Sequence, residues 1–365
     1  MRFDLVVRVA GIFTAALALA GAGTGCSISL DTAPPLAVDA GADALVELVG
    51  CAPLRGAASR VTGRLDSVTL AEGSLLIVAG AATVGGDTDA FLFGAAAPGA
   101  AGACLENAAV VPAPLVLGTP LDPAAHTRPL AGLTSPDGIT SLYFESLHAD
   151  GLGSDGLGVA RWDGAARRFG APVLLWTADR PSFGSGVGFD GTFVYVIGGR
   201  AGGFLSSDMF VARVPPDRLA IAGAYEYAQG GGAWGPDADG AGPFAEGGTS
   251  PSLAFYPERA RWLLAYATPL GGEVTLRSGL GPAGPWSLPV KLGRCAVPET
   301  DPEAFCADVV LHPALSPPAG QPPAGGAADE IVLSYGVGTF SATADTFAPA
   351  YETRLVRAPW PPALP

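Results

Sequence analysis

Five polar residues stand where short apolar strands are expected to begin: Asp66, Asp179, Arg180, Glu246 and His312. Two carboxyl groups facing each other across a cleft can supply the acid and the base for cleavage of a glycosidic bond, and their separation selects retention or inversion. Asp66 and Glu246 are therefore the catalytic candidates, and Asp179, Arg180 and His312 are candidates for substrate binding. Turn caps and hydrogen bonds between neighbouring sheets use the same residue types, so this structural interpretation stays open beside the catalytic one.

Aromatic residues offer a second way to hold a sugar, because an aromatic ring presents a rigid apolar face. Tyr225, Tyr227 and Trp234 are candidates for stacking on sugar rings, and packing in the core is the alternative use. The segment Gly85–Asp89 suits a calcium site or a hairpin turn, and the turn is the better explanation. The histidines at positions 126, 148 and 312 lack the spacing of metal ligands. We expect no metal and no cofactor.

A repeated unit of strands would position these residues. Residues 248–287 contain an apolar strand, the polar turn Pro257-Glu258-Arg259, and two further strands. Similar units recur about 50 to 70 residues apart. Their second strands begin at Leu75, Ile139, Thr192, Trp262 and Ile331. Five such meanders predict an all-β, five-bladed β-propeller, in which the first strands line a central funnel. A two-sheet sandwich is the alternative, but its strands would not group into five similar meanders.

The composition agrees with many short strands and excludes some functions. The chain has 365 residues, of which 52 are Gly and 34 are Pro, while charged residues make up only 15%. This balance favours strands joined by turns over long amphipathic helices. The net charge is −14, and Lys291 is the single lysine among the 20 basic residues. Such a chain repels phosphate backbones, so nucleic acid is excluded as the expected partner.

The N-terminus has the pattern of an export signal. Arg2 and Arg8 precede an apolar segment, Val9–Ala22, and Cys26 follows a short run of small residues. This resembles a bacterial lipoprotein signal, which would leave Cys26 lipidated, although Gly23 departs from the usual pattern. A plain secreted protein and an uncleaved anchor are the alternatives. We expect a signal peptide over residues 1–26, a flexible tether and lead-in over 27–60, and the propeller over 61–365. The expected location is the bacterial cell envelope, at the outer membrane or the surface, with secretion as the alternative.

Four further cysteines form an even set in an exported chain, where disulfides persist. We expect the pairs Cys51–Cys104 and Cys295–Cys306, because each pair closes a local segment. Two other connectivities are open, as are four free thiols.

The fourth unit carries six short motifs: Tyr225-Glu226-Tyr227, Gly232-Ala233-Trp234, Ser250-Pro251-Ser252, Arg261-Trp262, Thr275-Leu276-Arg277-Ser278 and Gly284-Pro285-Trp286-Ser287. These motifs resemble the domain-of-unknown-function 4185 family, a family similar to five-bladed glycoside hydrolases that include enzymes acting on arabinans. The fifth unit matches related secreted propellers at Cys306, His312-Pro313 and Ser334-Tyr335. The resemblance covers most of residues 61–360 and is strongest after residue 220. It implies substrate contacts by His312 and Tyr335.

The chain departs from that pattern at two carboxylates. Alanine stands in Val78–Thr83 where relatives have an aspartate, and Ala314 follows His312-Pro313 where they have a glutamate. An acid–base pair is therefore difficult to assemble. We expect a monomeric envelope lipoprotein that binds an extracellular polysaccharide and contacts the membrane only through its anchor. The alternatives are a scaffold for an envelope protein and an active hydrolase of arabinan-like polysaccharide.

Overall fold

The computed structural model describes residues 38–39, 46–47, 59–61, 63–84, 87–95, 109–114, 126–148, 154–203, 206–268, 272–316, 330–341, 343 and 351–360. The part of the chain that it describes consists of strands, turns and three short 3-10 helices. These helices are η1 (Pro216–Arg218), η2 (Ala222–Ala224) and η3 (Pro257–Arg259).

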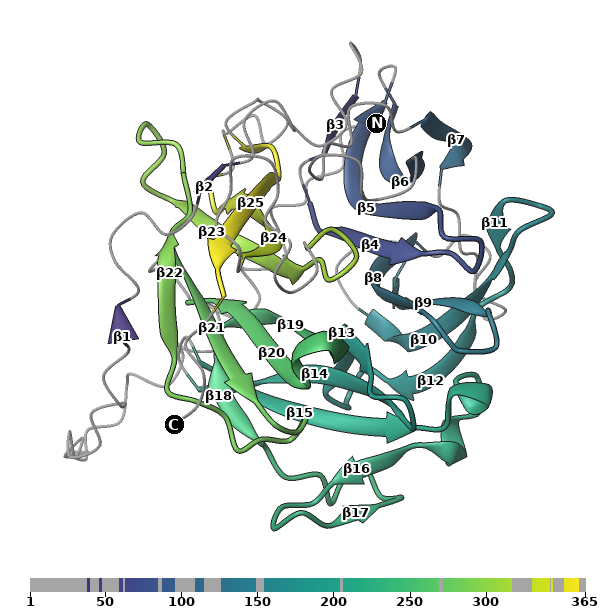
Figure 1. Ribbon diagram of the computed structural model, residues 1–365. Coiled ribbons are helices and arrows are strands. Elements are labelled where there is room, and N and C mark those ends of the chain that lie inside the picture. Colours follow the sequence, from purple (N-terminus) through teal and green to yellow (C-terminus); the bar gives the residue numbers. More distant parts are fainter. Residues whose placement is uncertain are drawn as a thin grey trace, which may run out of the picture.

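The strands form five sheets in chain order around a common centre (Figure 1). Blade one contains β3 (Ser59–Val61), β4 (Leu65–Thr69), β5 (Leu75–Val84), β6 (Asp87–Ala95) and β7 (Ala109–Pro114). Blade two contains β8 (His126–Thr134), β9 (Thr140–Leu147), β10 (Ser154–Asp163), β11 (Arg168–Phe169) and β12 (Val173–Thr177). Blade three contains β13 (Ser182–Phe189), β14 (Val194–Gly203), β15 (Ser206–Val214), β16 (Glu226–Ala228), β17 (Trp234–Gly235) and β18 (Ala245–Gly247).

The last two blades also take in strands from the N-terminal part of the chain. Blade four contains β19 (Thr249–Tyr256), β20 (Arg261–Ala267), β21 (Glu273–Gly279), β22 (Val290–Arg294) and β1 (Val38–Asp39). Blade five contains β23 (Ala304–Leu311), β24 (Glu330–Thr339), β25 (Arg354–Pro359) and β2 (Val46–Glu47). The prediction of an all-β, five-bladed propeller is confirmed, with the second strands beginning within two residues of the expected positions.

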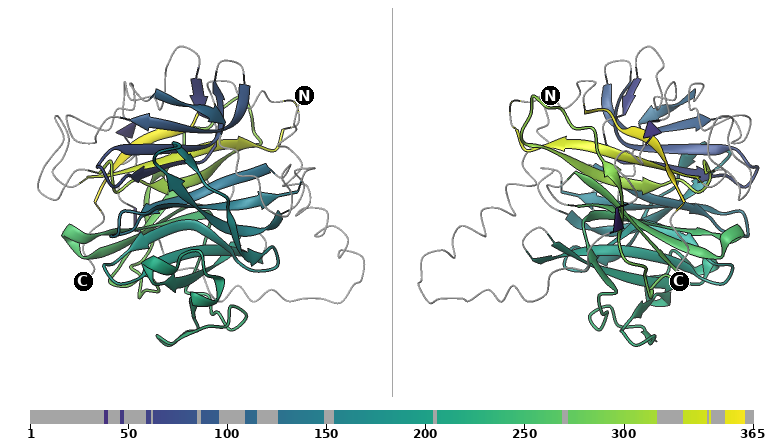
Figure 2. Two further views of the ribbon diagram at one scale, coloured as in Figure 1. Left: turned by 90° about the vertical axis from the view of Figure 1, so that its right-hand side faces the viewer. Right: turned by 60° about the vertical axis from the view of Figure 1, so that its left-hand side comes forward.

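The first strands of the blades, β4, β8, β13, β19 and β23, form the inner ring. Each packs against the next, and β23 packs against β4, so that the ring is closed. Blade five is joined to blade one by Thr353, whose backbone N–H donates to the carbonyl of Val61 at 2.7 Å and whose hydroxyl donates to the carbonyl of Gly63 at 2.6 Å. The side views in Figure 2 show the sheets twisting around this centre.

The expected tether is not free of regular structure. β1 pairs in parallel with β22, and β2 pairs antiparallel with β25. Without β1 and β2, the strands β22 and β25 would present unpaired backbone groups at the edges of blades four and five. Short segments of residues 27–60 therefore pair with these edges, although the sequence alone predicts a flexible tether and lead-in there.

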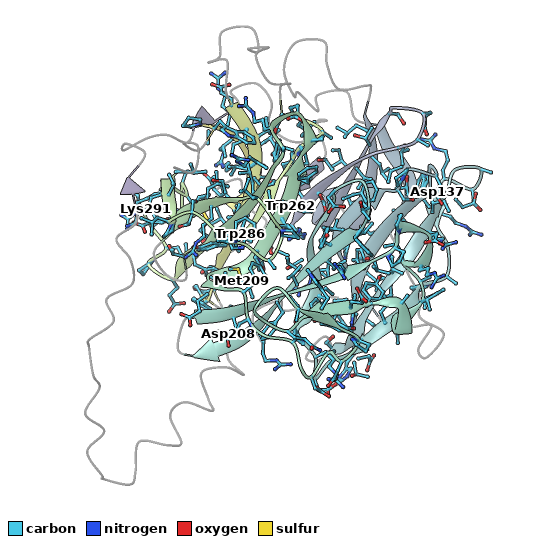
Figure 3. All side chains as sticks on the ribbon, turned by 60° about the horizontal axis from the view of Figure 1, so that its bottom comes forward. Asp137, Asp208, Met209, Trp262, Trp286 and Lys291 are labelled. Carbon is cyan, nitrogen blue, oxygen red and sulfur yellow. A yellow bond between two sulfur atoms is a disulfide. The ribbon has the colours of Figure 1, made fainter. Side chains whose placement is uncertain are left out.

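Buried apolar side chains fill the space between successive blades. One cluster joins blades three and four and includes Met209, Trp262 and, partly buried, Trp286 (Figure 3). Trp262 is 2% exposed. It lies against Gly188 of blade three, where a Cβ atom would come within 2.5 Å of the indole carbon Cζ3. Close approach of the two sheets therefore requires glycine at this position.

Candidate functional site

The first strands share a break in their pairing with the second strands of their blades. The register shifts between Pro129 and Gly132 in β8, and the corresponding strands of blades three, four and five shift at the matching points. In blade one the break falls between β3 and β4, which both pair with β5. A bulge re-aims the side chains of its strand. Four strands with bulges and one interrupted strand therefore surround the same level of the central axis.

Arg64 occupies this level in blade one. Its Nη2 atom donates a hydrogen bond of 2.6 Å to the carbonyl oxygen of Ser185 in blade three. The side chain therefore crosses from one blade to another that is not its neighbour in the ring. Arg64 is 5% exposed, and its Nε atom has no hydrogen-bond partner. Burial lowers the pKa of Arg64, while the charges of Asp66 and Asp308 oppose this effect.

Asp66 links blade one to blade two. Its Oδ1 atom accepts a hydrogen bond from the N–H of Ser67 at 2.7 Å, and its Oδ2 atom accepts one from the N–H of Gly132 at 3.0 Å. Burial raises the pKa of this carboxyl, while Arg64 and the two N–H groups oppose the rise. A raised pKa would suit a general acid. However, Asp66 is only 6% exposed and both of its oxygens are occupied, so the observed role is to hold two blades together.

His312 lies between blades one and five and is fully buried. Its Nδ1 atom is 2.8 Å from the hydroxyl of Ser67, and its Nε2 atom is 2.9 Å from the hydroxyl of Ser334. Burial, and then the charge of Arg64, lower the pKa of His312 to about 3. The imidazole is therefore neutral. Although a Ser–His pair can act as a nucleophile and a base, no substrate can reach this one. The prediction that His312 contacts substrate is wrong.

Two charged features of the inner strands were not singled out from the sequence. Asp308 is the bulge residue of blade five, with φ of +49°, and it is partly exposed. Its charge acts on Arg64. On β8, Arg128 forms an ion pair of 2.5 Å with Glu145 of β9. We call Arg64, Asp66 and Asp308 the central cluster. Arg64 was not singled out either, and the signal that identifies it in the sequence is a charged residue directly before the first strand β4.

The structure does not bring Glu246 to Asp66. Glu246 is exposed and lies on β18, which pairs with β15, two strands outward from the inner ring. Asp179 is exposed in the turn after β12, where the hydroxyl of Thr177 donates to it and lowers the pKa of its carboxyl. Arg180 forms an ion pair with Asp239 of blade three. These residues therefore do not form one site with the central cluster.

The predicted aromatic contacts lie largely in the core. Tyr225 is 1% exposed, and its hydroxyl is 2.9 Å from that of Tyr143. Tyr227 is 4% exposed and accepts a hydrogen bond of 2.7 Å from Nε1 of Trp176. Trp234 is partly buried beneath the guanidinium of Arg213. Packing against neighbouring strands, rather than sugar binding, explains these side chains.

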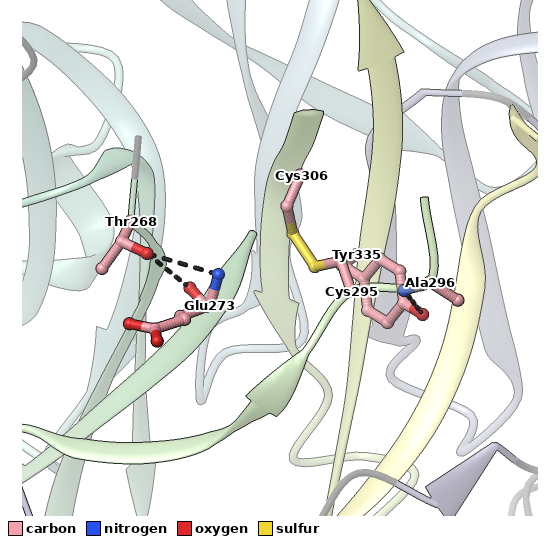
Figure 4. Close-up of a disulfide and its surroundings, with 6 residues drawn as sticks. All are labelled: Thr268, Glu273, Cys295, Ala296, Cys306 and Tyr335. Atoms are coloured by element: carbon pink, nitrogen blue, oxygen red, sulfur yellow. Dashed lines mark hydrogen bonds between the residues drawn. A yellow bond between two sulfur atoms is a disulfide. The ribbon is translucent and has the colours of Figure 1, made fainter. Parts of the chain in front are cut away.

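Tyr335 is buried beside a disulfide. Its hydroxyl accepts a hydrogen bond of 3.0 Å from the N–H of Ala296, next to the predicted bond between Cys295 and Cys306 (Figure 4). This disulfide is present and joins the end of blade four to the first strand of blade five. The prediction that Tyr335 binds substrate is corrected to a structural role. Cys26, Cys51 and Cys104 lie outside the described residues.

Val84 pairs with Asp87 where β5 and β6 meet, which agrees with the hairpin expected at Gly85–Asp89, although Gly85 and Gly86 themselves lie outside the described residues. Within the described ranges, no group of three or more His, Cys, Asp or Glu side chains could hold a metal ion. No helix in the described part of the chain is long and apolar enough to cross a membrane.

Comparisons with known proteins place the fold. No protein-family model matches the chain, and no curated protein matches its sequence. Among solved structures, a putative hydrolase from Bacteroides ovatus is similar with a TM-score of 0.54 and 13% identity, over 81% of this chain and 85% of that one. A levansucrase variant complexed with sucrose is similar with a TM-score of 0.50 and 8% identity, over 82% of each chain. A GH43_1 enzyme from Xanthomonas citri complexed with xylotriose follows with a TM-score of 0.48 and 15% identity, over 82% of this chain and 87% of that one. The chain therefore shares its overall fold with the putative hydrolase and the levansucrase.

Proposed function

We propose that this chain is a cell-envelope lipoprotein, anchored through Cys26, whose propeller binds an extracellular glycan at the central cluster without cleaving it. The observation that carries the proposal is the partly exposed carboxylate of Asp308, at the bulge of blade five, whose charge acts on the buried Arg64 of blade one. A partly exposed carboxylate offers acceptors to sugar hydroxyl groups. The sucrose-bound levansucrase and the motifs resembling the domain-of-unknown-function 4185 family support a carbohydrate as the ligand.

Binding without cleavage is favoured by the state of the carboxyl groups. Glycosidic cleavage uses two carboxyl groups about 5 to 10 Å apart on either side of the bond. Asp66 is buried with both oxygens hydrogen-bonded, and Glu246 lies on an outer strand. Neither Asp66 nor Glu246 can therefore serve as a second free carboxyl group beside Asp308. We expect no release of reducing sugar from any glycan that the protein binds, and such release would contradict this part of the proposal.

Asp308→Asn tests the central cluster. Asparagine tolerates the left-handed backbone of this position, so the substitution removes the charge without straining the strand. Loss of a hydrogen bond to a charged group should weaken binding about 10- to 100-fold. Glu246→Gln, which removes a carboxylate from the outer strand β18, is the control and should bind as the unaltered protein does.

The measurement is a glycan array with the Cys26→Ser protein, followed by calorimetric titration of the best glycan with both variants. If no glycan binds, or if Asp308→Asn binds as tightly as Glu246→Gln, the proposal fails.

Lipid anchoring is tested separately. Mass spectrometry of the protein from the membrane fraction should show a lipidated N-terminal Cys26, and Cys26→Ser should release the protein from that fraction. An unmodified Cys26 would refute the anchor and leave glycan binding to the array. We propose that the propeller acts as a monomer, for which the released Cys26→Ser protein should elute from a sizing column at the mass of one chain.

A further inference from the structure

A hollow of about 510 Å³ lies at the opposite end of the first strand β4 from the central cluster. It lies between the turn that joins β4 to β5 and turns of blade two. Asp137, which is labelled in Figure 3, belongs to one of these turns of blade two. The volume of the hollow falls within the range of small-molecule sites. We call it the lower groove. The residues that line it and enter the argument are Leu70, Glu72, Ser74, Thr140, Trp162 and Arg167.

The lower groove has an apolar floor. Trp162 is partly exposed and packs, together with Leu70, against the buried cluster between blades one and two. Phe169 holds the indole edge-on, with ring centroids 5.2 Å apart. A tryptophan fixed in this way offers a ligand a large apolar surface at little cost in side-chain entropy.

The rim of the groove carries one charge of each sign. The carboxylate of Glu72 accepts a hydrogen bond of 2.7 Å from the hydroxyl of Ser74, which lowers the pKa of Glu72 and keeps it ionised. Arg167 is exposed and forms no ion pair or hydrogen bond with another described residue. With one charge of each sign, the rim offers neither an anionic nor a cationic ligand a net attraction. The rim therefore favours a neutral ligand with many hydroxyl groups, for which a carboxylate and a guanidinium supply acceptors and donors.

We propose that the lower groove is a second glycan-binding site, which takes a neutral sugar unit with its apolar face on Trp162 and its hydroxyl groups on Glu72 and Arg167. The inference rests on the proposed function, because it assumes the same class of ligand. Arg64 and Leu70 lie at the two ends of β4, about 20 Å apart at the usual rise of a strand. One short oligosaccharide cannot fill both sites, so each propeller binds two glycan segments and can link two chains of a polysaccharide.

Arg167→Asn is the principal test. Arg167 has φ of +49°, a conformation that asparagine tolerates, so the change removes the guanidinium without disturbing the turn. Arg168→Gln is the matched control, because Arg168 is exposed on the next residue and does not line the groove. Trp162→Leu is a second variant, which retains apolar packing on Phe169 but removes the aromatic surface.

The experiment titrates a short neutral oligosaccharide, chosen as the best binder on the array, into the Cys26→Ser protein in a calorimeter. Two molecules should bind each chain. In Arg167→Asn and Trp162→Leu, one of the two affinities should fall at least about tenfold, as expected for loss of a charged hydrogen bond or a stacking surface. Arg168→Gln should keep both. Light scattering should show that the unaltered protein aggregates the parent polysaccharide and that these two variants do not.

The outcomes separate this inference from the proposed function. If Asp308→Asn weakens binding while Arg167→Asn and Trp162→Leu leave stoichiometry and both affinities unchanged, the lower groove is not a glycan site and the central cluster stands. If Arg167→Asn abolishes binding while Asp308→Asn has no effect, the lower groove stands and the central cluster fails. If no glycan binds, both are refuted.

Discussion

Replacement of His312 by asparagine should change how the stability of the propeller depends on pH. His312 is fully buried between the hydroxyl groups of Ser67 and Ser334, and burial lowers its pKa to about 3, against an ordinary value of 6.5. The unfolded chain therefore binds a proton at this imidazole below pH 6.5, whereas the folded chain does not until about pH 3. Because the unfolded state holds more protons in this window, the free energy of unfolding falls as the pH is lowered through it. Above pH 6.5 the group makes no difference.

The size of the effect follows from the width of the window. The free energy of unfolding should fall by about 1.4 kcal/mol per pH unit below 6.5, or roughly 2 kcal/mol between pH 6.5 and 5, through this residue alone. His312→Asn removes the titrating group and should remove this slope. At pH 7 the variant should be less stable by about 1 to 3 kcal/mol, because at least one buried serine hydroxyl loses its partner.

Urea denaturation of the Cys26→Ser protein at several pH values between 5 and 7.5 measures both effects. His148→Asn is the control, because His148 is half-exposed beside Asp155 and is not buried as His312 is. The buried carboxyl of Asp66 responds to acid in the opposite sense, but it is common to all three proteins and cancels in their comparison. If the free energy of unfolding of His312→Asn falls between pH 6.5 and 5 as steeply as that of the unaltered protein, the buried neutral imidazole is not the cause of the acid sensitivity.

Three further predictions concern the packing of the blades, each measured as a free energy of unfolding in urea. Replacing both Cys295 and Cys306 by serine opens a loop whose ends are 11 residues apart and should cost about 2 to 3 kcal/mol; equal stability would contradict a role for the bond in joining blades four and five. Gly188→Ala places a Cβ 2.5 Å from Trp262 and should cost about 1 to 3 kcal/mol, whereas Gly223→Ala, with nothing within 4 Å, should be tolerated; similar effects of the two would argue against close packing at Gly188. Asp66→Ala leaves the N–H groups of Ser67 and Gly132 without their acceptor and should cost about 3 kcal/mol, and a loss below 1 kcal/mol would show that water replaces the carboxylate.

The repeated unit could be predicted from the sequence because strands and turns depend largely on residues that are close together in the chain. Alternation of apolar residues, with Pro and Gly at the turns, marks each meander, so the second strands begin close to the predicted residues. The pair Cys295–Cys306 was predicted for the same reason, since a short loop brings its ends together without help from the rest of the fold. The outer strands β1 and β2 were not predicted, because each consists of two residues whose pairing partners are more than 200 residues away.

The candidate site was less predictable, because exposure and direction decide whether a polar residue does chemistry. Asp66 and His312 were found, but the sequence does not reveal that backbone N–H groups and serine hydroxyls of other blades occupy them. The tyrosines at 225, 227 and 335 are compatible with a binding surface or a core until the neighbouring sheets are placed against them.

The sequence by itself therefore determines the strands, the turns, the number of blades and the charge balance, all of which depend on residues near one another in the chain. Closure of the ring determines the rest. Only when five sheets meet around one axis does Arg64 reach Ser185, does Asp308 act on Arg64, and does Glu246 fall on an outer strand away from both. These relations depend on contacts between distant blades, whose geometry is fixed by side-chain packing across the whole propeller and not by any local pattern.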